Sequence, residues 1–286
     1  MIASARRLRS LLFVPGDRHD RMRKALAAGA DALILDLEDS VAPEGKTDAR
    51  AHVAAFLGEA AASGTALFVR INPLDSGLTD ADLDAVLAAR PTGLVLPKAE
   101  GAASIADLDE RLRARGDKDS LILPIATETP RALFTLGEYG SVRDRLAALT
   151  WGAEDLPAAV GALTARHEDG SYTPPYEIAR ALTLFAAAAA EVMPIDTVYP
   201  AIRDLDGLAA YAGRAARDGF LGMMAVHPDQ VPVINAAFTP SQAAVTHARA
   251  VIDIFAANPG AGVLTLEGKM IDRPHLNKAQ ALLARL

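Results

Sequence analysis

The 286-residue sequence contains no cysteine. This absence excludes disulfide bonds, zinc–thiolate sites and a thiol nucleophile. Long apolar runs are also missing, because none approaches the roughly 20 residues that a membrane span needs. No hydrophobic signal-peptide segment follows the basic start of the sequence. We therefore expect a cytoplasmic protein that makes no membrane contact.

Positive charge is in short supply as well. Lys and Arg number 29 against 36 Asp and Glu, which gives a formal net charge of −7. The basic residues cluster only in the stretch ARRLR at residues 5–9, which we interpret as a solvated chain end rather than a targeting segment. Without a basic surface, the chain is not expected to bind nucleic acid.

What the sequence does contain is eight short apolar runs, each ending at a polar or charged residue. They cover residues 11–18, 31–39, 66–72, 93–100, 121–129, 148–155, 196–204 and 220–228. Runs of Val, Ile and Leu without strict alternation indicate parallel strands that are buried on both faces. The segments between them are long enough for helices, so the sequence predicts an α/β fold, the closed (β/α)8 TIM barrel.

The length fits one barrel of about 250 residues with an appendage. We expect the barrel domain over residues 1–238 and a C-terminal extension over residues 239–286. In the extension, Thr239 or Ser241 is the expected N-cap of a helix, and a short hairpin and a terminal helix follow. Because the extension is too small to fold alone, we expect it to dock on the barrel mouth or on a neighbouring subunit.

Barrel enzymes carry their chemistry at the carboxyl ends of the strands. Here Glu128 and Asp155 end the fifth and sixth runs, so adjacent strands would bring two carboxylates within reach of one ion. Mg2+ prefers oxygen ligands and fills its other positions with water or substrate. The alternative is that these acids cap the helices that follow them. The spacing alone leaves both interpretations open.

Arg70 ends the third run, where its guanidinium could hold a carboxylate or neutralise charge on a carbonyl oxygen. It could equally pair with the acids that end the second run. Of these, Asp36 and Glu38 share one face of the strand, and they could act as a base or orient Arg70 and metal-bound waters. Lys98 could form a Schiff base, but we favour an ion pair with the carboxylates.

Two further strand ends carry basic groups that could bind a ligand or serve the fold. A Pro-Gly turn after the first run is followed by several basic residues at the predicted start of a helix, including Arg18 and Lys24, and these would attract phosphate. They could also form an ordinary solvated face. His227 precedes a proline at the last strand end, and we expect it to make a structural hydrogen bond.

The chain resembles the citrate lyase beta-subunit-like branch of the HpcH/HpaI aldolase superfamily, which includes malyl-CoA and citramalyl-CoA lyases. The resemblance runs from about residue 8 to the end. It is carried by LLFVPGDR, DALILDLEDSVAPEGKTDAR, VRINP, LVLPKAE, ILPIATETP, LTWGAEDL, IDTVYPAIRDLDGL, VHPDQVPVINAAFTPS and LEGKMIDRPHLNKA. One departure is the eighth strand, where many relatives have a lysine before the His-Pro pair and this chain has Met223 and Met224.

The resemblance implies a barrel that holds Mg2+ through Glu128 and Asp155. A 2-oxo acid would chelate the ion through its carboxylate and ketone, with Arg70 at the carbonyl oxygen. It also implies a lid from a neighbouring subunit, in a homotrimer or higher homo-oligomer, that brings Asp272 of the GKMID motif into the active site. The expected substrate- and CoA-binding residues are Phe13, Arg18, Lys24, Arg70, Glu128, Glu154, Asp155, Val226 and His227.

The sequence therefore predicts a Mg2+-dependent carbon–carbon lyase. It would cleave a 3-hydroxyacyl-CoA thioester of the malyl-CoA or citramalyl-CoA type to acetyl-CoA and a 2-oxo acid, glyoxylate or pyruvate. The expected catalytic residues are Arg70, Asp272, Glu38 and Asp36. The alternatives are a malyl-CoA thioesterase, a citrate lyase beta subunit, and a regulatory subunit that binds an oxo acid without catalysis.

Overall fold

The computed structural model describes residues 7–286. The first two residues of the basic stretch at 5–9 lie outside this range. Leu8 is buried, and the Arg9 guanidinium lies 2.8 Å from the Asp31 carboxylate. The interpretation of this stretch as a solvated chain end is therefore wrong for Leu8 and Arg9, whose side chains take part in the fold.

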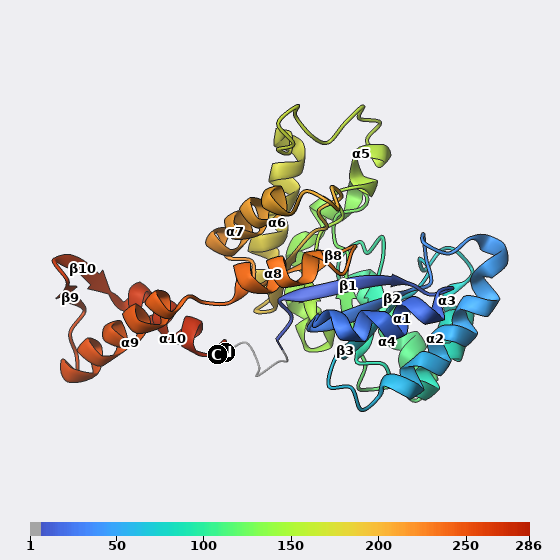
Figure 1. Cartoon of the computed structure of the whole chain (residues 1–286), viewed down its shortest axis with the longest axis horizontal. Coiled ribbons are helices and arrows are strands. Elements are labelled where there is room, and N and C mark those ends of the chain that lie inside the picture. Colours follow the sequence, from blue (N-terminus) through green and yellow to red (C-terminus); the bar gives the residue numbers. More distant parts are fainter. Residues whose placement is uncertain (1–6) are drawn as a thin grey trace. The chain divides into compact units, whose positions relative to one another are not determined.

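Strands and helices alternate along the chain as far as residue 238 (Figure 1). The strands are β1 (Ser10–Pro15), β2 (Ala32–Asp36), β3 (Ala66–Arg70), β4 (Gly93–Leu96), β5 (Leu121–Pro124), β6 (Ala148–Leu149), β7 (Met193–Asp196) and β8 (Gly222–Ala225). The α-helices are α1 (His19–Ala25), α2 (Lys46–Ala60), α3 (Thr79–Val86), α4 (Ala102–Ala114), α5 (Asp155–Ala159), α6 (Pro174–Ala189), α7 (Leu205–Asp218) and α8 (Gln230–Phe238). After β5 the helical layer consists of two 3-10 segments, η4 (Arg131–Phe134) and η5 (Leu136–Arg145).

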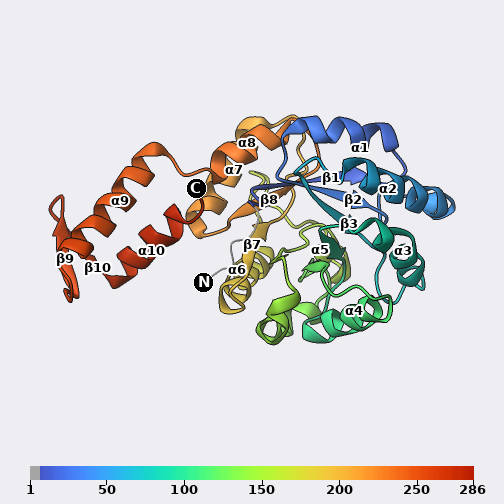
Figure 2. The same ribbon diagram turned by 90° about the horizontal axis from the view of Figure 1, so that it is seen from below.

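The eight strands form one parallel sheet in the order β5-β4-β3-β2-β1-β8-β7-β6. Between the two end strands, single parallel bridges join Ile122 to Leu146 and Ile125 to Thr150, and the Ala147 amide donates to the Ile122 carbonyl. These contacts close the barrel, and the helices lie around it (Figure 2). The predicted TIM-barrel fold is confirmed.

The strands are buried on both faces because two clusters of apolar side chains share them. Ile34, Phe68 and Val95 belong to a cluster built almost wholly from strand residues, which fills the barrel interior. Leu33 and Leu35 point the other way, into a cluster that includes apolar residues of the surrounding helices. This two-sided burial explains why the runs lack polar alternation.

The seventh strand differs from its prediction. β7 covers Met193–Asp196 rather than residues 196–204, and the chain leaves the sheet after Asp196 pairs with Met223. Pro200 has no amide to donate to a ladder, and Ile202 is 42% exposed. The apolar residues that suggested a strand at 196–204 therefore belong mainly to a loop at the strand end.

Residues Thr239–Leu286 form a separate compact unit. It consists of α9 (Gln242–Ala257), the antiparallel hairpin of β9 (Val263–Leu266) and β10 (Lys269–Asp272), and α10 (Arg273–Leu283). The hydroxyl of Ser241 caps α9 by accepting from the Ala244 amide at 3.2 Å. Val251, Phe255 and Ile271 form its small apolar core. Its docking as a lid stays a prediction. Within residues 7–286, no helix combines the length and apolar character that crossing a bilayer requires.

Candidate active site

A cavity of about 460 Å³ opens at the carboxyl ends of the barrel strands. Its walls combine acidic side chains and one arginine with apolar side chains, and they come from the ends of seven strands. The lining residues are Phe13, Pro15, Asp36, Asp39, Ser40, Arg70, Ile125, Glu128, Gly152, Ala153, Glu154, Asp155, Thr197, Val198, Met224 and Val226.

Arg70 at the end of β3 is held from two sides. Its Nε and Nη2 donate to the two carboxylate oxygens of Asp36 at 2.7 Å each, and its Nη1 lies 2.9 Å from Oε2 of Glu38. The guanidinium also lies over the Phe13 ring, 4.9 Å from its centroid. The ion-pair interpretation of Arg70 is thus confirmed, and the bidentate contact fixes the plane of the guanidinium at the cavity wall.

This pairing changes how the acids titrate. Burial is the strongest single influence on Asp36 and opposes its ionisation, but the hydrogen bonds and charge of Arg70 together with the bonds from Ser40 and Glu38 outweigh it, so the pKa of Asp36 lies below its ordinary value. For Glu38, burial dominates over the attraction of Arg70 and the pKa is raised. Two neighbouring carboxyl groups on one strand end therefore differ in proton affinity because their shares of Arg70 differ.

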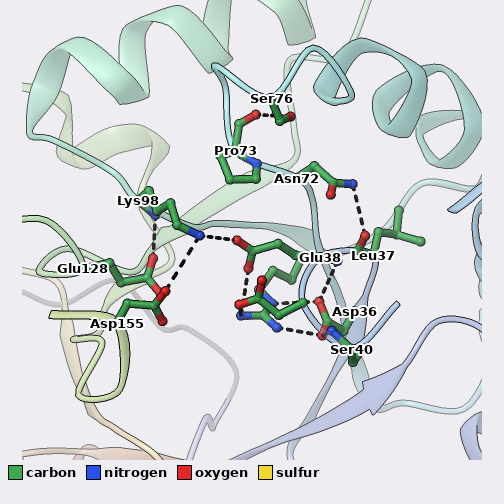
Figure 3. A network of polar contacts seen from close by, with 12 residues as sticks. Asp36, Leu37, Glu38, Ser40, Asn72, Pro73, Ser76, Lys98, Glu128 and Asp155 are labelled. Atoms are coloured by element: carbon green, nitrogen blue, oxygen red, sulfur yellow. Dashed lines mark hydrogen bonds and ion pairs between the residues drawn. The ribbon is translucent and has the colours of Figure 1, made fainter. Parts of the chain in front are cut away.

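Lys98, which follows β4, connects the acids of β2 to those of β5 and β6 (Figure 3). Its Nζ donates to Oε1 of Glu38 at 2.7 Å and lies 3.9 Å from Oδ1 of Asp155. Its backbone amide donates to Oε2 of Glu128 at 2.5 Å, and its φ of 52° lies in the left-handed region. Although burial opposes its charge, the hydrogen bond to Glu38 raises the pKa of Lys98. A Schiff-base lysine needs a neutral amine, so the ion-pair interpretation is confirmed.

Glu128 is almost fully buried, and its carboxylate lies beside that of Asp155 (Figure 3). Burial raises its pKa to about 8, and the negative charges of Asp155 and Glu38 act in the same direction against the Lys98 amide. A Cβ at position 152 would collide with Cγ of Glu128, so only glycine leaves room for this side chain. A buried carboxylate destabilised by neighbouring carboxylates is a site where a cation would be favoured.

The donor set suits a hard divalent cation, because Glu128 and Asp155 offer only oxygen. Among residues 7–286, no three His, Cys, Asp or Glu side chains gather into a complete metal cage. A cation here would therefore take its remaining ligands from water or substrate, as Mg2+ commonly does. Capping does not explain Asp155, because Glu154 is the N-cap of α5 and no side-chain cap bond is formed there.

Other predicted residues are placed less centrally. Phe13, Glu154 and Val226 line the cavity, whereas Arg18 and Lys24 do not. The helix after β1 was expected to present both basic residues at its start, but this is wrong for Lys24, which lies in the last turn of the seven-residue α1. The helix is short because the chain tightens into a 3-10 turn that ends at a left-handed glycine.

His227 makes the structural contact that was expected of it. Its ring Nδ1 accepts from the backbone amide of Asp229 at 3.2 Å. Asp272 lies in the C-terminal unit, where it is the N-cap of α10 and shares a capping box with His275. The hydrogen bond from His275 lowers the pKa of Asp272. Entry of Asp272 into a barrel pocket stays a prediction.

Sequence reasoning missed the groups that support this site. Nζ of Lys46 donates to the carbonyls of Leu37 and Glu38 at 2.7 Å each and to Asn72 Oδ1 at 2.9 Å. Lys46 thereby ties the ends of β2 and β3 to the start of α2. A lysine in the polar segment where a helix begins carries no sequence signal for such a role. The sequence contains one tryptophan, Trp151, directly before the acidic GAED segment. Its position could have indicated a residue that supports the site.

Comparisons with known proteins agree with this geometry. Residues 9–228 match the family described as HpcH/HpaI aldolase/citrate lyase. The citrate lyase subunit beta-like protein of Mycobacterium tuberculosis (strain CDC 1551 / Oshkosh) is 36% identical over 274 residues, which cover 96% of this chain and 94% of the relative. The mitochondrial citramalyl-CoA lyase of Rattus norvegicus is 34% identical over 289 residues, with 95% and 84% covered.

Among solved structures, the protein CitE from Mycobacterium tuberculosis in complex with magnesium, acetoacetate and coenzyme A is similar to this chain. The TM-score is 0.80 at 34% identity, over 100% of this chain and 99% of CitE. The matched segment therefore spans the residues of both the barrel and the C-terminal unit. With a family match over most of the chain and relatives above 30% identity, the chain belongs to the HpcH/HpaI aldolase/citrate lyase family.

Proposed function

We propose that this protein is a Mg2+-dependent carbon–carbon lyase that cleaves a 3-hydroxyacyl-CoA thioester into acetyl-CoA and a 2-oxo acid. The substrate would be of the malyl-CoA or citramalyl-CoA type, with glyoxylate or pyruvate as the second product. The observation that carries the proposal is the cavity at the barrel mouth, where Glu128 and Asp155 lie beside one another (Figure 3) and Arg70 lines the same wall. The activities named for the relatives support the same class of reaction.

Glu128 and Asp155 are the residues that would hold the metal. Their oxygen donors, the burial of Glu128 and the missing side chain at Gly152 fit such an ion. When bound, Mg2+ supplies Lewis-acid polarisation of the oxygen that becomes the ketone. The magnesium in the CitE complex supports this assignment.

The reaction requires a balanced movement of electrons and protons. The bond between the second and third acyl carbons breaks and its electron pair goes to the second carbon. The 3-hydroxyl gives its proton to solvent water and becomes the carbonyl of the 2-oxo acid, and the second carbon takes up one proton, so that no net proton is gained or lost. Arg70 would hold its positive charge beside that oxygen, with Asp36 fixing the guanidinium. Glu38 would act with Asp36 on Arg70 rather than on the substrate, because its carboxylate lies between Arg70 and Lys98.

The second carbon must gain a proton, and Asp272 is our candidate for this transfer. It would act as an acid in cleavage and as a base in condensation. We propose that Asp272 reaches the pocket of a neighbouring subunit, in a homotrimer or a higher homo-oligomer.

The CoA part of the substrate would lie along the rim of the cavity. Phe13 and Val226 line it, and Arg18 and Lys24 are exposed basic residues on the segment after β1. His227 would contribute through the backbone turn that its ring stabilises. The coenzyme A in the CitE complex supports a site for this group.

A citrate lyase beta subunit is the second candidate, because the identity to a citrate lyase subunit beta-like protein is 36%. Such a subunit would act on a citryl thioester. A malyl-CoA thioesterase and a regulatory oxo-acid-binding subunit are the remaining alternatives. They differ from the lyase in their products, since a thioesterase releases free CoA and a regulatory subunit releases nothing.

The test is a panel of CoA thioesters, including malyl-CoA, citramalyl-CoA and citryl-CoA, with purified protein and Mg2+. Free thiol and 2-oxo acid are measured separately. A lyase forms 2-oxo acid and acetyl-CoA without free thiol, and excess EDTA stops it. Thiol release without oxo acid would instead identify a thioesterase, and no turnover of any thioester would reject the proposal for the isolated chain.

A further inference from the structure

A buried carboxylate that is not part of the cavity wall gathers donors from four elements. Asp196 at the end of β7 is fully buried. Its Oδ1 accepts from Nε1 of Trp151 at 2.6 Å, from the Thr197 amide at 2.9 Å and from the Tyr211 hydroxyl at 3.1 Å. Its Oδ2 accepts from Nε and Nη2 of Arg180 at 3.0 and 2.8 Å. Every polar atom of this carboxylate is therefore satisfied, and its charge is balanced by Arg180.

One of these donors, Trp151, lies directly before the loop that packs on Glu128 and carries Asp155, the two carboxylates proposed to hold the metal. Trp151 follows β6 and begins the loop whose next four residues, 152–155, all line the cavity. Gly152 packs so closely on Glu128 that a methyl group would not fit. Asp155 ends the loop and starts α5. A shift of the indole ring would therefore move both the backbone that touches Glu128 and the backbone that carries Asp155.

We infer that Asp196 is a positioning residue: through its hydrogen bond to Trp151 it holds the 152–155 loop so that Asp155 and Glu128 are correctly spaced for one divalent cation. The inference rests on the proposed metal site. Arg180 holds the Asp196 carboxylate in one orientation through two hydrogen bonds, and the indole N–H of Trp151 is bound to the carboxylate that is held in this way. Removal of a residue that orients the ligands of a metal ion typically weakens metal binding by about 10- to 100-fold.

A purely structural role for the same cluster would predict lower stability without a selective change in metal binding. The chain offers a matched pair of variants that separates the two roles. Trp151→Phe and Tyr211→Phe each remove one donor to the same oxygen of Asp196. Trp151 is joined through the backbone to the cavity loop, whereas Tyr211 belongs to α7. Both variants should lower the melting temperature measured in EDTA.

Mg2+ affinity, measured by calorimetry on the full-length protein, is the deciding quantity. We expect Trp151→Phe to weaken it by about tenfold or more, and Tyr211→Phe to leave it within about twofold. Gly152→Ala is the positive control, because its methyl group displaces Glu128 without touching Asp196. Should Trp151→Phe fail to fold, Asp196→Asn replaces it and should weaken Mg2+ binding in the same way.

The single tryptophan supplies a second measurement. Mg2+ should change the emission of Trp151 in the wild type and in Tyr211→Phe, with midpoints equal to the calorimetric ones, and Asp196→Asn should shift the midpoint to higher concentration. If the wild type binds no Mg2+, the proposed function fails, whatever the variants do. If the wild type binds and Trp151→Phe binds as tightly as Tyr211→Phe, the cluster is structural and the positioning role is wrong.

Discussion

At the scale of residues, the barrel mouth carries an excess of negative charge. Its acids outnumber its bases: among residues 7–286, the ion pairs of Asp36, Glu38 and Asp155 are made with Arg70 and Lys98, and Glu128 accepts from the backbone amide of Lys98. Buried carboxylates are stable only when each has a partner. Arg70 pairs with the acids after β2, and Lys98 reaches from Glu38 toward Asp155. The negative charges of Glu128 and Asp155 are therefore the least compensated in the site. A divalent cation would balance that side.

Arg70→Lys should not preserve activity. A lysine provides a point charge and cannot make the bidentate contact to Asp36 while also facing the cavity. We expect kcat to fall by about 10²-fold or more, the cost of one preorganised oxyanion donor. Steady-state kinetics on the best thioester measure this, and near-native kcat would show that Arg70 acts only as an ion-pair partner of the acids.

The Asp36–Arg70 pair should make stability depend on acid pH. The folded-state pKa of Asp36 lies below its ordinary value of 3.8, so the pair stabilises the fold above that pH and loses its effect as pH falls through the folded pKa. Breaking it with Asp36→Asn should cost about 3 kcal/mol at pH 6, typical for a buried pair.

Urea unfolding of the wild type and Asp36→Asn between pH 6 and pH 2.5 measures the difference in their free energies of unfolding. This difference should become smaller toward pH 2.5. Asp75→Asn, at an exposed acid, is the control and should change the unfolding free energy by less than about 0.5 kcal/mol. A difference in unfolding free energy between the wild type and Asp36→Asn that stays constant with pH would contradict the assigned Asp36–Arg70 pair.

At the scale of elements, seven of the eight βα units contribute to the cavity wall, and the units differ in regularity. β6 has only two residues, and the helical layer after β5 is made of 3-10 turns. The irregular units are those that present Glu128 and Asp155. The strand ends are fixed by parallel pairing, while the loops after them are free to place functional groups.

The segment from β1 into α1 is the expected phosphate-binding element. Arg18→Ala and Lys24→Ala should each raise KM for acyl-CoA by about two- to fivefold, the size expected for exposed ion pairs. Affinity for the 2-oxo acid should stay the same, and the effect should shrink as salt rises.

Arg21→Ala on the same helix is the matched control and should leave KM unchanged. A short α1 places Lys24 one turn or more from Arg18, so Arg18 should have the larger effect. Equal weakening of acyl-CoA and oxo acid in either variant would indicate a folding defect rather than a phosphate contact.

At the scale of the whole molecule, the chain divides into a barrel unit and a C-terminal unit of 48 residues, Thr239–Leu286. The small unit has few buried apolar residues of its own. It carries Asp272, whose side chain already caps α10. Asn is as good an N-cap as Asp, so Asp272→Asn should remove the proton-transfer group while preserving the fold of this unit.

Asp272→Asn should therefore be folded and inactive. If Asp272 acts in a neighbour's pocket, mixing Asp272→Asn chains with Arg70→Ala chains should restore part of the activity, because some mixed interfaces combine an intact barrel with an intact lid. Differently tagged chains show whether subunits exchange. Exchange without recovered activity would mean that the unit acts within its own subunit.

The sequence by itself determined the barrel, because two-sided burial leaves strands as continuous apolar runs and their polar ends mark the mouth. It also placed Arg70, Glu128 and Asp155 at strand ends, since those residues directly follow buried runs. It misplaced the seventh strand, because a loop with Val198 and Ile202 has the same composition as a strand.

Only the tertiary structure decided how the charges are shared. That Lys98 bridges Glu38 to Asp155, that Lys46 holds the carbonyls of the β2 end, and that Asp196 gathers Trp151 and Arg180 depend on residues more than ten positions apart in most cases. Such contacts follow from the closing of the barrel, which brings distant strand ends together, and no local pattern encodes them.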